Sequence, residues 1–181
     1  ACVEAAAEEG VKYLSLFAFS EENWNRPEAE VSTLMGLMMK SIADEIDSLA
    51  ARGVAFRVLG NLSRLDKNLV EAIHKAEELT ALPSGKEPLL TLIVFLSYSG
   101  KWDILQAAKR MAKEYADDPV RLESIDIEDF DHYLVTNGIP DPDLIIRTSG
   151  EERLSNYLLW QAAYSEFVFV DTLWPDFRKE E

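Results

Sequence analysis

The stretch Leu89–Leu96 restricts the fold more than any other part of this sequence. It is a continuous apolar run interrupted only by Thr91, and it is too short to cross a bilayer. A continuous run of this length is typical of a strand that is buried on both faces, whereas a strand with one wet face alternates. Helical patterns lie on either side of it along the chain. We therefore expect an α/β protein with a mostly parallel central sheet and helices on both faces.

The rest of the chain repeats this alternation of strands and helices. After Pro27, which suits the first turn of a helix, apolar residues recur at helical spacing as far as Arg52, where Gly53 ends the pattern. We expect a single domain over residues 1–181. The predicted helices are Ala1–Glu9, Pro27–Arg52, Ser63–Leu79 (capped by Ser63), Lys101–Tyr115, Ile127–Val135 and Ser155–Ser165. The predicted strands are Val11–Phe19, Val54–Leu59, Leu89–Leu96, Leu144–Arg147 and Phe167–Val170.

The charge balance limits the partners of this chain. It carries 33 acidic and 18 basic residues, for a net charge of -15, so it repels nucleic acid overall and we expect no nucleic-acid partner. An anionic ligand would need a local cationic pocket set against that field. The single cysteine, Cys2, excludes an internal disulfide and fits a reducing compartment.

Polar segments follow three of the predicted strands. In parallel sheets ligands collect at the carboxyl ends of the strands, and here these ends carry hydroxyls, amides, glycines and the arginines Arg26, Arg147 and Arg153. Guanidinium groups match phosphate oxygens with forked donors. Ser155 could cap a helix and present its N-terminus to the same anion. Three arginines on one predicted edge, in a chain this acidic, indicate a phosphate or diphosphate site.

Simpler interpretations of these residues remain open. A single arginine at a strand end is often half of a surface ion pair, and Trp24 and Trp102 are more often packing residues than ligand contacts. Ser97–Gly100 could be an ordinary strand-to-helix turn. The sequence contains no zinc-type His/Cys spacing, no Walker-type loop, no GxGxxG and no GxSxG, so nucleotide cofactors and the hydrolase elbow are unsupported.

Four segments resemble the cis-prenyltransferases, and most closely the bacterial undecaprenyl diphosphate synthases. They are SEENWNRP (20–27), SYSGKWDI (97–104), IRTSGEERLSNYLLWQAAYSE (146–166) and LWPDF (173–177). The resemblance spans essentially the whole chain in the right order. It implies a transferase that condenses isopentenyl diphosphate units onto an allylic diphosphate such as farnesyl diphosphate. The product would be a long polyprenyl diphosphate, expected to be the undecaprenyl lipid carrier precursor for cell-wall synthesis.

The resemblance also implies roles for individual residues. Arg147, Arg153, Leu154 and Ser155 would hold the isopentenyl diphosphate. Ser20, Glu21, Glu22, Trp24 and Arg26 would form a second substrate-contact segment. Asn23 matches the position of a proton acceptor, but a neutral amide is a poor base, so an orienting or relay role is favoured. Glu166 matches a Mg²⁺ ligand, although it precedes its predicted strand and could reach the site across a dimer contact.

The sequence also departs from the family. Members begin with a strand ending in a MDGNGRWA-like segment and finish with an RxxRFG-like tail, and neither is present in this sequence. A non-catalytic partner subunit of the same fold, or an inactive fragment, is therefore the alternative hypothesis. The resemblance further implies a homodimer formed through the C-terminal part. A cytoplasmic enzyme with a long lipid product would make transient, peripheral contact with the inner membrane face.

Overall fold

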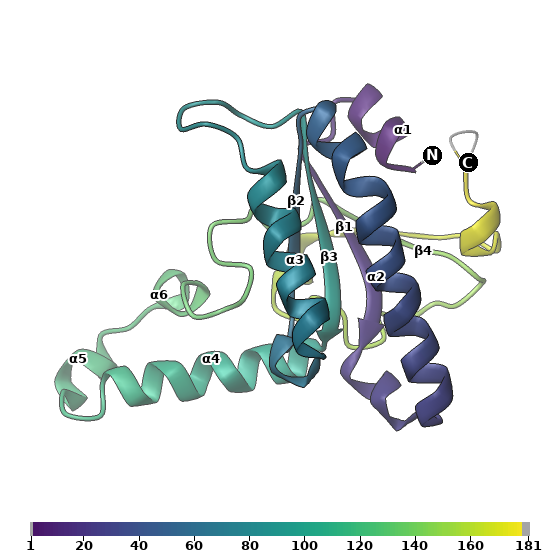
Figure 1. Cartoon of the computed structure of the whole chain (residues 1–181). Helices are drawn as coiled ribbons and strands as arrows, with labels where there is room; N and C mark the ends of the chain where they lie inside the picture. The colour runs from purple at the N-terminus through teal and green to yellow at the C-terminus, as the bar shows by residue number, and fades with distance from the viewer. Residues whose placement is uncertain (1, 179–181) are drawn as a thin grey trace. The chain divides into compact units, whose positions relative to one another are not determined.

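The computed structural model describes residues 2–178, without the side chain of Pro119. It groups them into two compact units, one formed by residues 2–97 with Arg178 and the other by residues 98–177. Figure 1 shows the whole chain. Ala1, the first residue of the predicted N-terminal helix, lies outside the described residues.

The first unit contains a three-stranded sheet. The order of its strands is β1-β3-β2, and β2 pairs with β3 in parallel, with Val54 opposite Leu90 and Leu59 opposite Phe95. Its elements are α1 (Cys2–Glu8), β1 (Tyr13–Ser20), the 3-10 helix η1 (Glu21–Asn25), α2 (Glu28–Ala51), β2 (Val54–Leu59), the 3-10 helix η2 (Leu62–Arg64), α3 (Lys67–Thr80) and β3 (Leu90–Tyr98). Each strand predicted for this part of the chain is present, within two residues of the expected bounds.

The core of the first unit forms where α2 and α3 pack against the sheet. The two helices contact one another and β2, and they run side by side in Figure 1. Every residue of β3 is buried, and alternate residues such as Leu92 and Val94 join one core cluster with Ile42 and Ile73 from the helices. The residues on the other face of β3 are buried as well, which confirms the prediction of a strand covered on both sides.

The second unit contains a two-stranded parallel sheet. Strand β4 (Leu144–Arg147) pairs with β5 (Glu166–Phe169), with Leu144 opposite Glu166 and Arg147 opposite Phe169. The other elements are α4 (Gly100–Glu114), α5 (Pro119–Glu123), α6 (Ile127–Asp131) and the 3-10 helices η3 (Gln161–Tyr164) and η4 (Trp174–Asp176). The parallel α/β pattern is thus confirmed, although the described strands form two sheets instead of one continuous sheet.

The predicted helix over Ser155–Ser165 is wrong. Ser155, Asn156 and Leu158 have positive φ values of 51°, 64° and 45°, which a right-handed helix cannot contain. The segment is instead held by the start of α4, because the amide of Gly100 donates to the Asn156 carbonyl at 2.7 Å and the amide of Lys101 donates to Asn156 Oδ1 at 3.0 Å. Only η3 remains helical.

Two further expectations need smaller corrections. Ser63 does not cap the third helix of the first unit: it lies in η2, and the Asp66 side chain caps α3 by accepting from the amide of Asn68. Helix α6 ends at Asp131, four residues before the predicted end. None of the helices in the described residues is both long and apolar enough to span a membrane.

Candidate functional site

The segment Ser20–Asn25 leaves the end of β1 as a short 3-10 helix. The backbone amide of Ser20 donates to Asn23 Oδ1 at 2.9 Å, so the side chain of Asn23 is fixed from within its own turn. Because its carbonyl oxygen is occupied, Asn23 can direct its NH₂ group, which is a donor, toward a ligand. This geometry favours the orienting role over that of a base. Asn23 is half-buried, and Glu22 and Arg26 are exposed.

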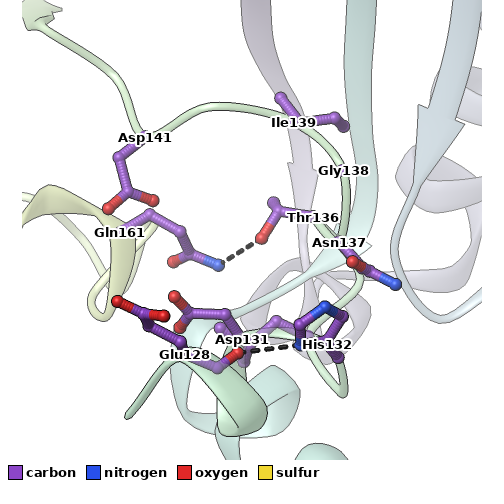
Figure 2. A pocket seen from close by; sticks show the side chains of 10 residues that line it. Glu128, Asp131, His132, Thr136, Asn137, Gly138, Ile139, Asp141 and Gln161 are labelled. Atoms are coloured by element: carbon purple, nitrogen blue, oxygen red, sulfur yellow. Dashed lines mark hydrogen bonds between the residues drawn. The ribbon is translucent and has the colours of Figure 1, made fainter.

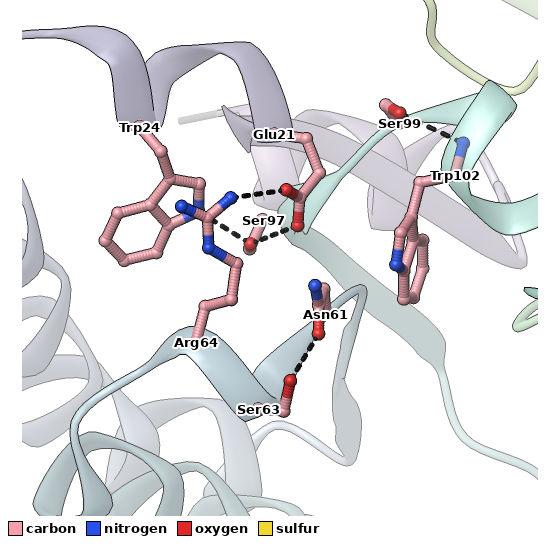
Figure 3. Close-up of polar contacts among 8 residues, drawn as sticks. All are labelled: Glu21, Trp24, Asn61, Ser63, Arg64, Ser97, Ser99 and Trp102. Carbon is pink, nitrogen blue, oxygen red and sulfur yellow. Dashed lines mark hydrogen bonds and ion pairs between the residues drawn. The ribbon is translucent and has the colours of Figure 1, made fainter.

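A chain of polar contacts connects this segment to the end of β3 (Figure 3). Trp24 Nε1 donates to the Ser97 hydroxyl at 2.8 Å, and that hydroxyl donates to Glu21 Oε1 at 2.8 Å. Arg64 Nη1 donates to Glu21 Oε2 at 2.7 Å. The Arg64 guanidinium also lies 4.7 Å from the centre of the Trp24 ring, within the range of a cation–π contact. Both oxygens of Glu21 are therefore engaged inside the protein.

A close backbone approach brings Arg64 to this position. Gly60 follows β2 with a φ of 140°, and a Cβ built on it would lie 2.0 Å from the Leu96 carbonyl oxygen. Only glycine allows the two backbones to come so close. The next amide, that of Asn61, donates to the Ser97 carbonyl at 2.9 Å. Gly60 thus joins the segment after β2 to the end of β3.

An apolar pocket opens next to the polar segment. It has a volume of about 180 Å³ and is lined from β1, α2 and β3 by Ala18, Phe19, Leu34, Met35, Leu37, Met38, Ser41 and Leu96. Phe19 and Ser20 are neighbours in β1, so the pocket and the polar segment start from the same strand end. Trp24 packs edge-on against Phe19, with ring centres 5.2 Å apart. The first unit therefore offers a polar site beside an apolar one.

In the second unit, Arg147 ends β4 and precedes a tightly held loop. The amide of Ser149 donates to the Thr172 carbonyl and that of Gly150 to the Val170 carbonyl, both at 2.9 Å. Ser149 has a φ of 72°, a conformation that residues other than glycine seldom adopt. Within the described part of the chain, no residue pairs with the Arg147 guanidinium. This loop therefore follows a guanidinium group with a fixed backbone, and a carboxylate is also close, because a Cβ built on Gly150 would lie 3.1 Å from Asp171 Oδ1.

The other two candidate arginines each form an exposed ion pair. Arg153 forms an ion pair with Glu151, and Arg26 in the first unit pairs with Glu30 at 2.6 Å. Both pairs are exposed, and such pairs contribute little stability, so an anion could displace either carboxylate. Leu154 and Ser155 are half-buried. Because Ser155 caps no helix, the predicted anion contact with a helix N-terminus is wrong. That Arg26, Arg147 and Arg153 share one crevice stays a prediction.

The sequence indicated that Glu166 precedes its strand, but in the structure Glu166 is the first residue of β5. It lies opposite Leu144, at the amino end of the strand pair, whereas Arg147 lies at the carboxyl end about 10 Å away by strand geometry. Its carboxylate suits Mg²⁺, which takes one or two protein carboxylates along with phosphate oxygens. Among residues 2–178, however, no group of three acidic, His or Cys residues could hold a metal.

The pocket described in the second unit is larger than the apolar pocket, but its lining is unsuited to an anion (Figure 2). It has a volume of about 330 Å³, and its lining includes the carboxylates of Glu128, Asp131 and Asp141. Burial, and then the charge of Asp131, raises the pKa of Asp141. A diphosphate would be repelled by this lining, so the pocket does not belong to the candidate site.

A buried carboxylate anchors the start of α4. Asp103 is 1% exposed and accepts from the amide of Val135 at 3.0 Å and from the hydroxyl of Tyr98 at 3.3 Å. Burial raises the pKa of Asp103, and the hydrogen bonds it accepts oppose that rise. Ser99 Oγ caps the helix by accepting from the amide of Trp102 (Figure 3). This part of Ser97–Gly100 is therefore the strand-to-helix turn that the sequence left open.

The comparisons with known proteins now decide the family. A family described as "Putative undecaprenyl diphosphate synthase" matches residues 1–181. The chain belongs to this family. It is 48% identical to an isoprenyl transferase of Rhizobium meliloti, over 98% of this chain and 70% of the relative. It is 45% identical to a ditrans,polycis-undecaprenyl-diphosphate synthase, (2E,6E)-farnesyl-diphosphate specific, of Haemophilus influenzae, over 99% of this chain and 73% of the relative.

Solved structures of the family share the fold. The lavandulyl diphosphate synthase of Lavandula x intermedia, solved with dimethylallyl diphosphate, superposes with a TM-score of 0.90 at 35% identity, over 97% of this chain and 74% of that chain. A probable undecaprenyl diphosphate synthase of Campylobacter jejuni gives a TM-score of 0.85 at 34% identity, over 99% and 81%. The predicted cis-prenyltransferase fold and prenyl-transferase class are thereby confirmed.

Arg64 was not among the predicted site residues. The predicted site contains the segments after the first, third and fourth strands, whereas Arg64 lies after the second, where Asn61 and Ser63 also follow Gly60. The same strand-end argument applied to Leu59 would have found this arginine. Its pairing with Glu21, 43 positions away, has no local signal.

Proposed function

We propose that this protein condenses isopentenyl diphosphate units onto an allylic diphosphate, farnesyl diphosphate as primer, to build a long cis-polyprenyl diphosphate. The observation that carries the proposal is the apolar pocket that starts at the same strand end as the polar segment Ser20–Arg26. A substrate with a charged head and a hydrocarbon tail needs both environments side by side. The pocket volume of about 180 Å³ is smaller than a typical ligand site, so the lining residues would form only part of a product tunnel.

Each step of the reaction assigns a task to the residues of this chain. The double bond of isopentenyl diphosphate attacks the first carbon of the allylic substrate, the bond to diphosphate breaks, and a proton then passes from the new unit to the released diphosphate or to water. Arg147, Arg153, Leu154 and Ser155 would hold isopentenyl diphosphate. Guanidinium groups are suited to this because their charge and forked donors match a diphosphate. Asn23 would orient the reacting ends with its NH₂ group, and the apolar pocket would keep water away.

The leaving diphosphate gathers negative charge, which a cation must offset. We propose Mg²⁺ as that cation, with Glu166 as one protein ligand and diphosphate oxygens as others. When bound, the ion would neutralise the leaving group. The position of Glu166 at the amino end of β5 agrees with a contribution to a second copy.

A homodimer through the C-terminal part belongs to the same proposal. Strand β5 and the segment after it expose Phe167, Val168, Phe169, Leu173 and Trp174, each between 41% and 58%. Contiguous exposed apolar residues mark association surfaces, and a second copy would cover them. We further propose that the enzyme is cytoplasmic and touches the inner membrane face transiently to release its lipid product. Light scattering of the purified full chain tests the dimer.

An elongation assay tests the function. The full chain is incubated with radiolabelled isopentenyl diphosphate, farnesyl diphosphate and Mg²⁺, and butanol-extractable products are counted. We expect long-chain products that vanish when the metal is chelated. A folded full chain that makes no product under these conditions would support the alternative, a non-catalytic partner subunit of the same fold.

A further inference from the structure

The Glu21 carboxylate is the centre of a closed ring of contacts, made only by residues of the first unit. Trp24 donates to Ser97, Ser97 donates to Glu21, Arg64 donates to Glu21, and the Arg64 guanidinium returns over the Trp24 ring. We refer to Glu21, Trp24, Arg64 and Ser97 as the strand-end ring (Figure 3). Its members come from η1, η2 and β3, so it links the ends of all three strands of the sheet.

The donors and acceptors of the ring allow only one arrangement. A serine hydroxyl has one proton to give, and Ser97, which is fully buried, gives it to Glu21 while accepting from Trp24. Ser97 also holds a φ of 53°, a strained conformation for a residue with a side chain that neighbouring contacts must maintain. The side chain of Glu21 is only 18% exposed, and a carboxylate so placed is costly unless a cation pairs with it. Arg64 supplies that cation.

The ring fixes the segment that carries Asn23. Glu21 and Trp24 flank Asn23 on η1, which has only five residues. A helix this short does not hold its shape without tertiary contacts. On the N-terminal side of Asn23, Glu21 is bonded to Arg64 and Ser97. On its C-terminal side, Trp24 is bonded to Ser97. Movement of Glu21 would therefore move Asn23.

We infer that Arg64 is a positioning residue, which holds the segment Ser20–Asn25 in its reactive geometry through Glu21. The inference rests on the proposed function and adds a residue to it that touches no substrate. It also gives Glu21 a second role, since both of its oxygens take part in the ring. The guanidinium must be planar and forked to stack on Trp24 and reach Glu21 at once, so lysine would replace it only in part.

The test compares kcat with KM in the full chain. Removal of a charged hydrogen-bonding partner predicts that Arg64→Gln lowers kcat by about tenfold to a hundredfold, with the KM for isopentenyl diphosphate within about twofold because Arg147 and Arg153 are untouched. Arg64→Lys should recover part of the lost kcat. Arg57, an exposed arginine on β2, provides the matched control, since Arg57→Gln removes the same charge outside the ring.

A double variant shows whether Arg64 acts through Glu21. If it does, the double variant Arg64→Gln/Glu21→Gln should have about the same kcat as the less active of the two single variants, because the second change breaks a contact that is already lost. The inference is overturned if the two losses multiply, if Arg64→Gln behaves like Arg57→Gln, or if the loss falls entirely on KM. Thermal unfolding confirms that each variant is folded. An inactive wild-type protein would instead refute the proposed function, so the two failures are distinct.

Discussion

Replacement of Gly60 by alanine should cause a large loss of stability. In Gly60→Ala the new methyl group would lie 2.0 Å from the Leu96 carbonyl oxygen at a φ of 140°. The backbone conformation costs about 1–3 kcal/mol, displacement of the packed carbonyl about 1–3 kcal/mol, and loss of the bond from the Asn61 amide to Ser97 about 1 kcal/mol. Together these reach roughly 3–7 kcal/mol, a large part of the roughly 5–15 kcal/mol that stabilises a typical domain.

Gly36 supplies the control within the same unit. It lies inside α2, and a Cβ built there would meet nothing within 4 Å, so Gly36→Ala should stabilise the protein by about 0.5–1 kcal/mol through helix propensity. Urea and thermal unfolding of the full chain measure both. At about 2–4 °C per kcal/mol for a chain of this size, Gly60→Ala should lower Tm by roughly 6 °C or more. Equal stability of the two variants would refute the close approach between β2 and β3.

Three further predictions concern the site and the core. Arg147→Ala should lower kcat/KM for isopentenyl diphosphate by about 30-fold, equivalent to about 2 kcal/mol for a lost charged contact, while Arg57→Ala leaves it unchanged; steady-state kinetics decide. Ala18→Leu should fill part of the apolar pocket and shorten the products seen by thin-layer chromatography, and unchanged lengths would remove the pocket from the product path. Because the folded pKa of Asp103 is raised, the stability it contributes is present below its unfolded value near 4 and declines as pH rises through the folded pKa. In urea unfolding from pH 4 upward, the free energy of unfolding of Asp103→Asn should therefore rise relative to that of the wild type. A difference in unfolding free energy that does not change with pH would contradict this.

Much of the fold was predictable because its strongest signals are local. The apolar run within Leu89–Leu96 indicates a fully buried strand, and the structure extends it only to Tyr98. The helical spacing that begins after Pro27 gives α2 almost to the residue. These elements follow from side-chain periodicity, which burial enforces along each segment.

The failures have a common physical cause in contacts between distant segments. The sequence of residues 155–165 satisfies helical periodicity, but the amides of Gly100 and Lys101 bind Asn156 and hold its backbone left-handed. The strand-end ring is equally invisible to local reasoning, because Ser97 and Glu21 are 76 positions apart. An anionic ligand for Arg26, Arg147 and Arg153 was predicted from residue type alone. Residue type does not reveal that Arg26 already pairs with Glu30 and Arg153 with Glu151.

The capped start of α4 has a consequence for how this chain can bind an anion. Its first amides are already bonded, those of Gly100 and Lys101 to Asn156 and that of Trp102 to Ser99, so no helix end there is left to grip a pyrophosphoryl group. An anion bound by this chain would therefore be held by groups other than these three amides, and in the proposed site those groups are the side chains of Arg147 and Arg153.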